Sequence, residues 1–341
     1  MSPTSTGTPP NGARVARRVL LPIAALAVLA LAILASVALG SHPTSPSDVI
    51  DVLYGTADPN TTAVVESRYP RTALGLLAGL CLAVAGTLMQ GVTRNPLADP
   101  GLLGITAGAS AAIVTAMAFL GASGQASTVW WALPGALLAG LLVHVIGSVG
   151  AGAGLARLVL AGAVVSAVLM AYVQAVTLSR PQVFDSYRYW VVGALGGRDF
   201  GVLMSVLPPA ALGLVLAVLL APGLNTLALG EESASALGAN PALMRAGGML
   251  AAILLSTAAT AAVGPIAFVG LAVPHIVRAL VGVDARTQIA FSAVAGPALL
   301  LLADVAGRVV LRPQELMVGV VTAFVGAPAL LLAVRRMKST A

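Results

Sequence analysis

The sequence carries very little charge, since only 9% of its residues are Asp, Glu, Lys or Arg. Soluble globular proteins carry about 25% charged residues, so this composition excludes an ordinary soluble domain. Hydrophobic residues make up 58% of the chain, and the mean hydropathy is +0.98. These values predict an all-α, polytopic membrane protein.

Three further absences narrow the function. The single cysteine, Cys81, excludes disulfides and cysteine metal sites, and we expect no metal or other cofactor. The chain has no GxxxxGK[ST] motif, so it does not hold ATP in a phosphate loop. No acid lies in the middle of an apolar run, whereas ion-driven carriers commonly bury ionisable groups there. A transporter without either feature must take its energy from a partner.

Ten apolar runs approach the length of about 20 residues that a membrane-spanning helix needs. We predict spans at 19–40, 70–91, 102–121, 129–149, 158–178, 202–221, 246–263, 266–282, 288–306 and 316–334. An even number of spans places both chain ends on one side. Basic clusters at 14–18 and 335–338 predict that this side is the cytoplasm. We therefore expect a disordered cytoplasmic N-terminus at 1–18, one transmembrane domain at 19–334 and a cytoplasmic tail at 335–341.

The apolar runs are rich in small residues, as in GLLAGLCLAVAG (75–86) and GITAGASAA (104–112). Small residues let helices approach closely, so we expect a densely packed bundle. The Val-Gly-Pro string at 263–265 predicts a tight turn between two spans, because proline disfavours a helical residue before it and lacks a donor.

One polar segment, the loop 222–245, separates two apolar runs. It carries the adjacent acids Glu231 and Glu232. We expect one short helix that ends at Gly238, and a second short helix that begins at Pro241. The segment is too polar to cross a bilayer, and we interpret it as the surface that a separate motor protein grips. A solvated connector is the alternative.

Six longer strings occur in order along the chain. They are RYPRTALGLLAGLCLAVAGTLMQ (68–90), RNPLADPGLLGITAGA (94–109), YWVVGALGG (189–197), LGEESASALG (229–238), VGPIAFVGLAVPHIVR (263–278) and LLADVAGRVVLRPQELMVGVVTAFVGAPALLL (301–332). Together they resemble the FecCD-type permease subunits of ABC importers for iron–siderophores and cobalamin. The resemblance covers about residues 20–335 and implies the type II, cobalamin-permease-like fold, with about ten transmembrane helices.

The resemblance also implies partners. These are a second permease subunit in a homo- or heterodimer, cytosolic ABC ATPase subunits, and an extracytoplasmic substrate-binding protein, all at the cytoplasmic (inner) membrane. The loop 222–245 matches the part of the family that couples to the ATPase. The coupling residues implied there are Glu231, Glu232, Ala236, Leu237 and Gly238.

Two further groups of residues take roles from the resemblance. Asn95 and Leu97 match a cytoplasmic gate, although an Asn-Pro sequence also forms a plain turn. A second constriction would fall near 150–154. The resemblance also matches three arginines, Arg68, Arg71 and Arg308, to basic positions that meet acidic residues of the binding protein. The alternative is that they anchor the protein at the membrane interface.

We therefore expect the permease subunit of an ATP-driven ABC importer that carries a ferric siderophore. We do not expect an enzyme, since ATP hydrolysis belongs to a separate subunit. A cobalamin or haem importer permease is the alternative, and an ion-coupled secondary transporter is a further one. Departures from the family pattern, with Ala285 where many relatives carry His and Met317 where Pro is common, bear on the substrate.

Overall fold

The computed structural model describes residues 11–148 and 155–338, and within these ranges it contains helices and no strand. The all-α prediction is thus confirmed. The elements are α1 (Asn11–Ala38), α2 (Pro46–Tyr54), α3 (Pro59–Glu66), α4 (Arg68–Thr93), the 3-10 helix η1 (Pro100–Leu103), α5 (Ile105–Phe119), α6 (Gln125–Ser148), α7 (Leu155–Ser179), α8 (Pro181–Val191), α9 (Phe200–Ala228), α10 (Glu231–Ala236), α11 (Pro241–Val263), α12 (Val269–Val281), α13 (Ala285–Val310) and α14 (Val318–Lys338).

The long apolar helices match the predicted spans. In the described part of the chain, seven helical segments are long and apolar enough to cross a membrane, and they contain α1, α4, α6, α7, α9, α11 and α13. Three shorter apolar helices, α5, α12 and the first half of α14, account for the other predicted spans. Two of them are short because part of the predicted span is not α-helical: the 3-10 helix η1 and Gly104 precede α5, and the turn at 264–268 precedes α12.

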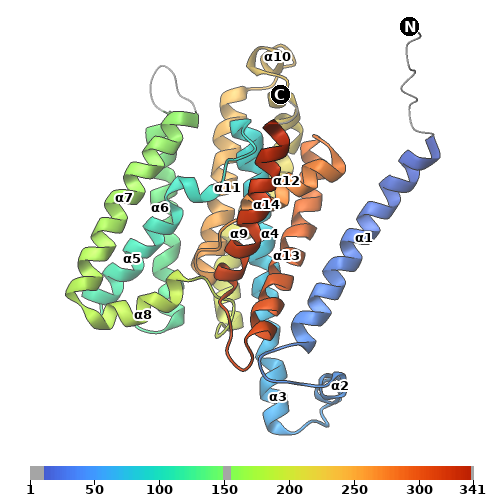
Figure 1. The fold of residues 1–341 in the computed structure, drawn as a ribbon. Coiled ribbons are helices and arrows are strands. Elements are labelled where there is room, and N and C mark those ends of the chain that lie inside the picture. Colours follow the sequence, from blue (N-terminus) through green and yellow to red (C-terminus); the bar gives the residue numbers. More distant parts are fainter. Residues whose placement is uncertain (1–10, 149–154, 339–341) are drawn as a thin grey trace.

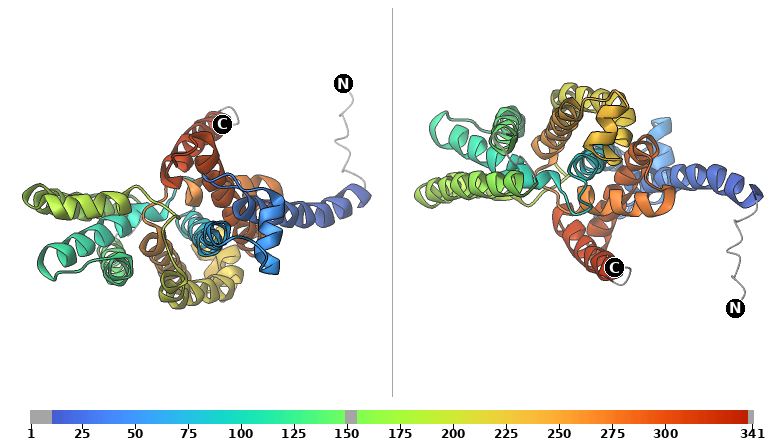
Figure 2. Two further views of the ribbon diagram at one scale, coloured as in Figure 1. Left: turned by 90° about the horizontal axis from the view of Figure 1, so that it is seen from below. Right: turned by 90° about the horizontal axis from the view of Figure 1, so that it is seen from above.

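The helices form a central bundle with additions on opposite sides (Figures 1 and 2). Helices α4, α9, α11, α12 and α13 pack together in the centre, and α4 and α11 are the most buried spans. Helices α5 to α8 form a lobe on one side, while α1 packs against α13 on the other. The small helix α10 lies at one end of the molecule and α2 with α3 at the other (Figure 1). We call these the α10 end and the α2–α3 end.

Glycines allow the close packing that the sequence predicts. A Cβ atom on Gly86 of α4 would lie 1.7 Å from the carbonyl oxygen of Gly270 in α12. A Cβ atom on Gly296 of α13 would lie 2.2 Å from the carbonyl oxygen of Gly79 in α4. No side chain fits at such distances, so these helices touch backbone to backbone.

The helices extend past the predicted spans at both chain ends. Helix α1 begins at Asn11, so residues 11–18 are helical rather than disordered. Helix α14 continues to Lys338, and the cytoplasmic location of the tail at 335–341 stays a prediction. Neither 13–21 nor 335–338 contains a Gly or Pro, so nothing in these stretches stops a helix. The basic clusters therefore lie on helical extensions of the spans.

The predicted turn at 263–265 is confirmed and serves a second purpose. Helix α11 ends at Val263, and Gly264 has φ +79°, a left-handed value that glycine adopts freely. The Val263 carbonyl accepts a hydrogen bond of 2.8 Å from the Ala194 N–H, and the Gly193 carbonyl accepts one of 3.2 Å from the Gly319 N–H. These bonds hold the loop after α8 against the end of α11 and the start of α14, and residues 194–198 of that loop line the pocket described below.

Candidate functional site

A buried charge network lies at the α2–α3 end. Arg71 of α4 donates to both carboxylate oxygens of Asp304 in α13, through Nε at 3.0 Å and Nη2 at 2.8 Å. Arg308, one turn further along α13, pairs with the same carboxylate at 3.0 Å and donates to the Ser36 carbonyl of α1 at 3.0 Å. One acid therefore holds two arginines and links three helices.

Two further contacts extend this network to the loops. Arg71 Nη1 donates to Glu315 Oε2 at 2.8 Å, and Glu315 Oε1 accepts from the Ser41 hydroxyl at 2.7 Å. Burial alone would raise the pKa of the Glu315 carboxyl, but the charge of Arg71 and these hydrogen bonds lower it below its ordinary value. Arg68 donates to the carbonyl oxygens of Val37, Ala38 and His42, and so fixes the chain that leaves α1.

The three arginines predicted to meet a binding protein thus lie at one end of the molecule but are not exposed as expected. Arg68 is 4% exposed and Arg308 is 1% exposed. The physical reason is that each guanidinium finds carbonyl and carboxylate acceptors inside the bundle, which repay its removal from water. Arg71 keeps a side-chain exposure of 13%. Their role in docking stays a prediction.

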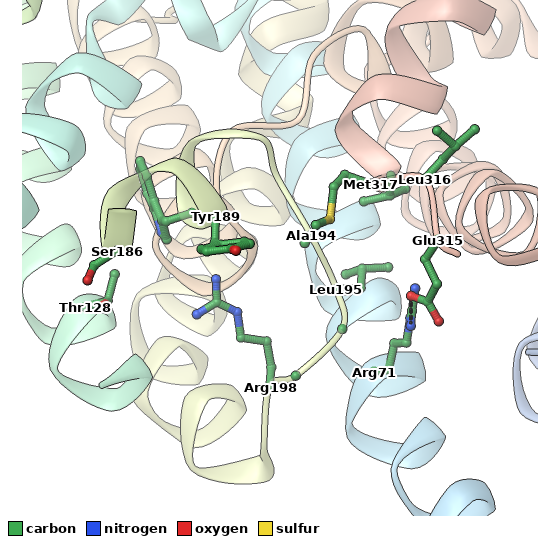
Figure 3. Close-up of a pocket in the computed structure, with 14 residues that line it drawn as sticks. Arg71, Thr128, Ser186, Tyr189, Ala194, Leu195, Arg198, Glu315, Leu316 and Met317 are labelled. Carbon is green, nitrogen blue, oxygen red and sulfur yellow. Dashed lines mark hydrogen bonds and ion pairs between the residues drawn. The ribbon is translucent and has the colours of Figure 1, made fainter. Parts of the chain in front are cut away.

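An open pocket of about 500 Å³ lies beside this network (Figure 3). Helix α8, the loop that follows it and the start of α14 supply its walls. The polar residues that line it are Arg71, Thr128, Ser186, Tyr189, Arg198 and Glu315. In Figure 3 the guanidinium of Arg198 points toward Tyr189, while Arg71 and Glu315 face each other on the opposite side. A pocket of this size suits a small molecule.

The sequence gives no signal for this pocket. Tyr187, Tyr189 and Trp190 look like aromatics of a membrane interface, yet Tyr187 and Trp190 are buried. The Tyr187 hydroxyl donates to Ser110 Oγ of α5 at 3.0 Å, so α8 folds back onto the lobe. Arg198 directly follows the family-like string at 189–197, and no local pattern indicates that its side chain lines a pocket.

The predicted gate residues lie after α4, on the side of the α10 end. Asn95 Oδ1 accepts a hydrogen bond of 2.9 Å from the Leu97 N–H, which is the plain turn considered as the alternative. Leu97 is 43% exposed. A turn that holds out a leucine is compatible with a gate, which stays a prediction. The second constriction near 150–154 lies outside the described residues.

The loop 222–245 contains less loop than predicted. Helix α9 continues to Ala228, and Pro241 begins the 23-residue helix α11 rather than a second short helix. The reason is that Asn240 caps α11, its Oδ1 accepting from the Leu243 N–H at 3.1 Å, and no further proline follows until Pro265. The short helix before Gly238 is confirmed as α10.

Helix α10 presents a small exposed surface at its end of the molecule (Figure 1). Leu237 is 64% exposed, and the neighbouring coupling residues Ala236 and Gly238 are also exposed. Glu231 pairs with Arg245 at the start of α11, which fixes α10 on the bundle, while Glu232 is exposed and has no ion pair among the described residues. The surface thus combines a leucine, a free acid and small residues.

Asp99, between α4 and η1, is a half-buried acid. The chain at 94–104 enters the bundle, and Asp99 lines a cavity of about 120 Å³ with Thr106, Ser256 and Thr260. A Cβ atom on Gly270 would lie 3.3 Å from Asp99 Oδ2 and 3.1 Å from the carbonyl oxygen of Leu82, near the middle of α4. Glycine at 270 thus leaves room for this segment beside α12.

A bundle of apolar helices, with a pocket at one end and a small polar helix at the other, defines a multi-pass membrane permease. The FecCD transport family model matches residues 28–336. The ferric enterobactin transport system permease protein FepD of Escherichia coli K12 is 45% identical, over 91% of this chain and 93% of that protein. The hemin transport system permease protein HmuU of Yersinia pestis is 37% identical, over 80% of this chain and 82% of that protein.

Structural comparison agrees. A solved inward-facing structure of a metal-chelate type ABC transporter matches with a TM-score of 0.78 and 26% identity, over 92% of this chain and 98% of that one. The chain belongs to the FecCD transport family and is a transport permease of the inner membrane.

Proposed function

We propose that this chain is the permease subunit of an ATP-driven ABC importer that carries a ferric siderophore. The observation that carries the proposal is the 45% identity, over nearly the whole of both chains, to a permease named for ferric enterobactin. The likeness to a metal-chelate type transporter supports the same class of cargo. Haem is the second candidate, because a hemin permease is 37% identical.

In this proposal the α10 end faces the cytoplasm, as do both chain ends. The exposed residues Glu232, Ala236, Leu237 and Gly238 contact an ATPase subunit, and the Glu231–Arg245 pair transmits its motion to α11. ATP binding and hydrolysis occur on that partner, and this chain re-orients its helices to open the path on alternate sides. A second permease subunit completes the path.

At the α2–α3 end the proposal places an extracytoplasmic binding protein. Arg71, with its partly exposed guanidinium, meets an acidic residue of that protein, while Arg68 and Arg308 hold the surrounding chain in place. The pocket beside Arg71 receives the released cargo. Asn95 and Leu97 narrow the other mouth of the path.

The test is uptake by proteoliposomes that contain the permease, its ATPase and its binding protein. We expect ATP-dependent uptake of a ferric siderophore, and no uptake when the ATPase carries an inactivating substitution. Uptake of haem but not of ferric siderophores would favour the second candidate. If neither enters, the proposal is wrong.

A further inference from the structure

We propose that Arg198 and the pocket around it form a subsite for anionic oxygen groups of the transported chelate. This inference rests on the proposed function, since it names the part of the permease that reads the charge of its cargo. Three observations carry it: an unpaired arginine, the charge balance of the pocket, and a second donor, the buried Trp190 indole, that has no acceptor in the described part of the chain.

Arg198 has no protein counterion in the described part of the chain. Its Nε atom is fully buried and has no hydrogen-bond partner there, and no carboxylate forms an ion pair with its guanidinium. The adjacent acid is occupied otherwise, because Asp199 Oδ1 accepts from the Val202 N–H at 3.0 Å and caps α9. An arginine stays protonated at any ordinary pH, so the pocket wall carries a permanent positive charge.

The other charges of the pocket are already matched. Arg71 is held by Asp304 and by Glu315, each at 2.8 Å, and Asp304 also serves Arg308. Arg198 therefore adds one uncompensated positive charge to the lining. A half-buried charge without a partner loses hydration and gains nothing in return, so an anion in the pocket would recover that energy.

The walls also offer a second free donor. The indole Nε1–H of Trp190, another lining residue, is buried and has no acceptor within the described ranges. Thr128 and Ser186, which Figure 3 shows on the side of the pocket that Arg198 and Tyr189 share, already donate their hydroxyl hydrogens to the carbonyl oxygens of Gly124 and Gln182, at 3.0 and 3.3 Å. Arg198 and Trp190 therefore supply the free donors of this wall. Catecholate and carboxylate oxygens are acceptors with negative charge, and they match such a wall better than a neutral ligand does.

The chain allows a direct measurement of this subsite. It has three tryptophans, so a Trp130→Phe/Trp131→Phe background leaves Trp190 as its single fluorescent indole at the pocket. Quenching of this signal, with the full chain in lipid nanodiscs, reports the binding of two probes of similar size. One is ferric tris-catecholate, which is strongly anionic, and the other is a neutral ferric tris-hydroxamate.

The variants are Arg198→Gln, Arg198→Lys and a control, Arg286→Gln. Arg286 lies in the first turn of α13, is exposed and does not line the pocket. We expect Arg198→Gln to weaken tris-catecholate binding by about tenfold, the loss of one charged hydrogen bond. Tris-hydroxamate binding should change less than about twofold, within the range of an exposed polar substitution. The affinity of Arg198→Lys for tris-catecholate should lie between those of the parent and of Arg198→Gln. The control should bind both probes as the parent does.

Equal weakening of both probes by Arg198→Gln would show that Arg198 only shapes the pocket, and unchanged tris-catecholate binding would show that it does not bind anions. Either result overturns the inference, even when the permease imports a ferric siderophore with its partners. Conversely, failure of that import would refute the proposed function while a charge-selective loss in Arg198→Gln still stood. Labelling of the buried Cys81 by a thiol dye checks that each variant is folded.

Discussion

Single residues at the α2–α3 end show how this bundle keeps charges inside an apolar protein. Asp304 is 1% exposed, and it serves Arg71 and Arg308 together. Neither arginine could be buried alone, because an unpaired ion inside a protein costs several kcal/mol. The network thus joins α1, α4 and α13, which are far apart in the sequence, at one end of the bundle.

We predict that Asp304→Asn destabilises the protein strongly. It leaves two arginines without their shared carboxylate, which should lower the free energy of unfolding by about 3–5 kcal/mol. Glu315→Gln is the matched control, because its carboxylate is one-third exposed and should contribute less than about 1 kcal/mol. The measurement is labelling of Cys81, the single and fully buried cysteine, along a denaturing-detergent titration. Equal losses for the two variants would contradict this account.

A second prediction concerns pH. The pKa of Glu315 is lower in the folded protein than its ordinary value of 4.5. Its ion pair therefore contributes stability above pH 4.5, and this contribution is lost as the pH falls through the lower, folded pKa. The stability difference between the parent and Glu315→Gln should be constant near neutral pH and should shrink below 4.5. A difference that stays constant on acidification would show that Arg71 does not act on this carboxyl.

At the scale of elements, the sequence predicts most of the helices and few of their contacts. Apolar run length gives the spans, and Pro265 gives the turn after α11, because both depend on neighbouring residues. The pairing of Arg71 with Asp304 joins positions 233 residues apart, and no local pattern indicates it. Helices α9 and α11 also extend beyond their apolar stretches into the polar segment. The loop 222–245 therefore contains fewer non-helical residues than its polarity suggests.

A substitution in the exposed surface beside helix α10 tests the proposed contact with the ATPase. Leu237→Asp places a charge in the surface proposed to contact the ATPase, and loss of an apolar anchor there should weaken the association by more than about tenfold. We expect less ATPase to copurify and uptake to fall in proportion. Leu237 is a sharper test than Gly238, whose φ of +79° would also strain any new side chain.

The control for this experiment is Leu53→Asp. Leu53 lies on α2, at the opposite end of the molecule, and is 72% exposed. The same change there should leave ATPase association intact. Normal uptake by Leu237→Asp would mean that the loop 222–245 is only a connector.

At the scale of the whole molecule, the question is whether ATP or an ion gradient drives transport. The half-buried Asp99, which lines a cavity inside the bundle, is an acid that an ion-coupled carrier could use, and no local pattern in the sequence indicates this position. We nevertheless expect ATP-driven transport, so Asp99→Asn should import cargo within about twofold of the parent rate, and a protonophore should have no effect while ATP is present. Loss of uptake in both experiments would indicate ion coupling. The measurement is initial uptake by proteoliposomes with both partners.

The helices also differ in how much they depend on one another. The span in α1 has a mean hydropathy of 2.7 with 11% of its residues buried, while that in α11 has 1.8 with 83% buried. A lipid bilayer therefore accepts α1 by itself. Helix α11, which carries Ser256 and Thr257, is stabilised in the membrane by contacts with helices synthesised before it. During biogenesis α1 can leave the translocon early as an anchor, and α11 must wait for the earlier helices α4, α6 and α9. Truncation of the nascent chain after α1 should thus leave a stably inserted peptide, and α11 alone should not insert efficiently.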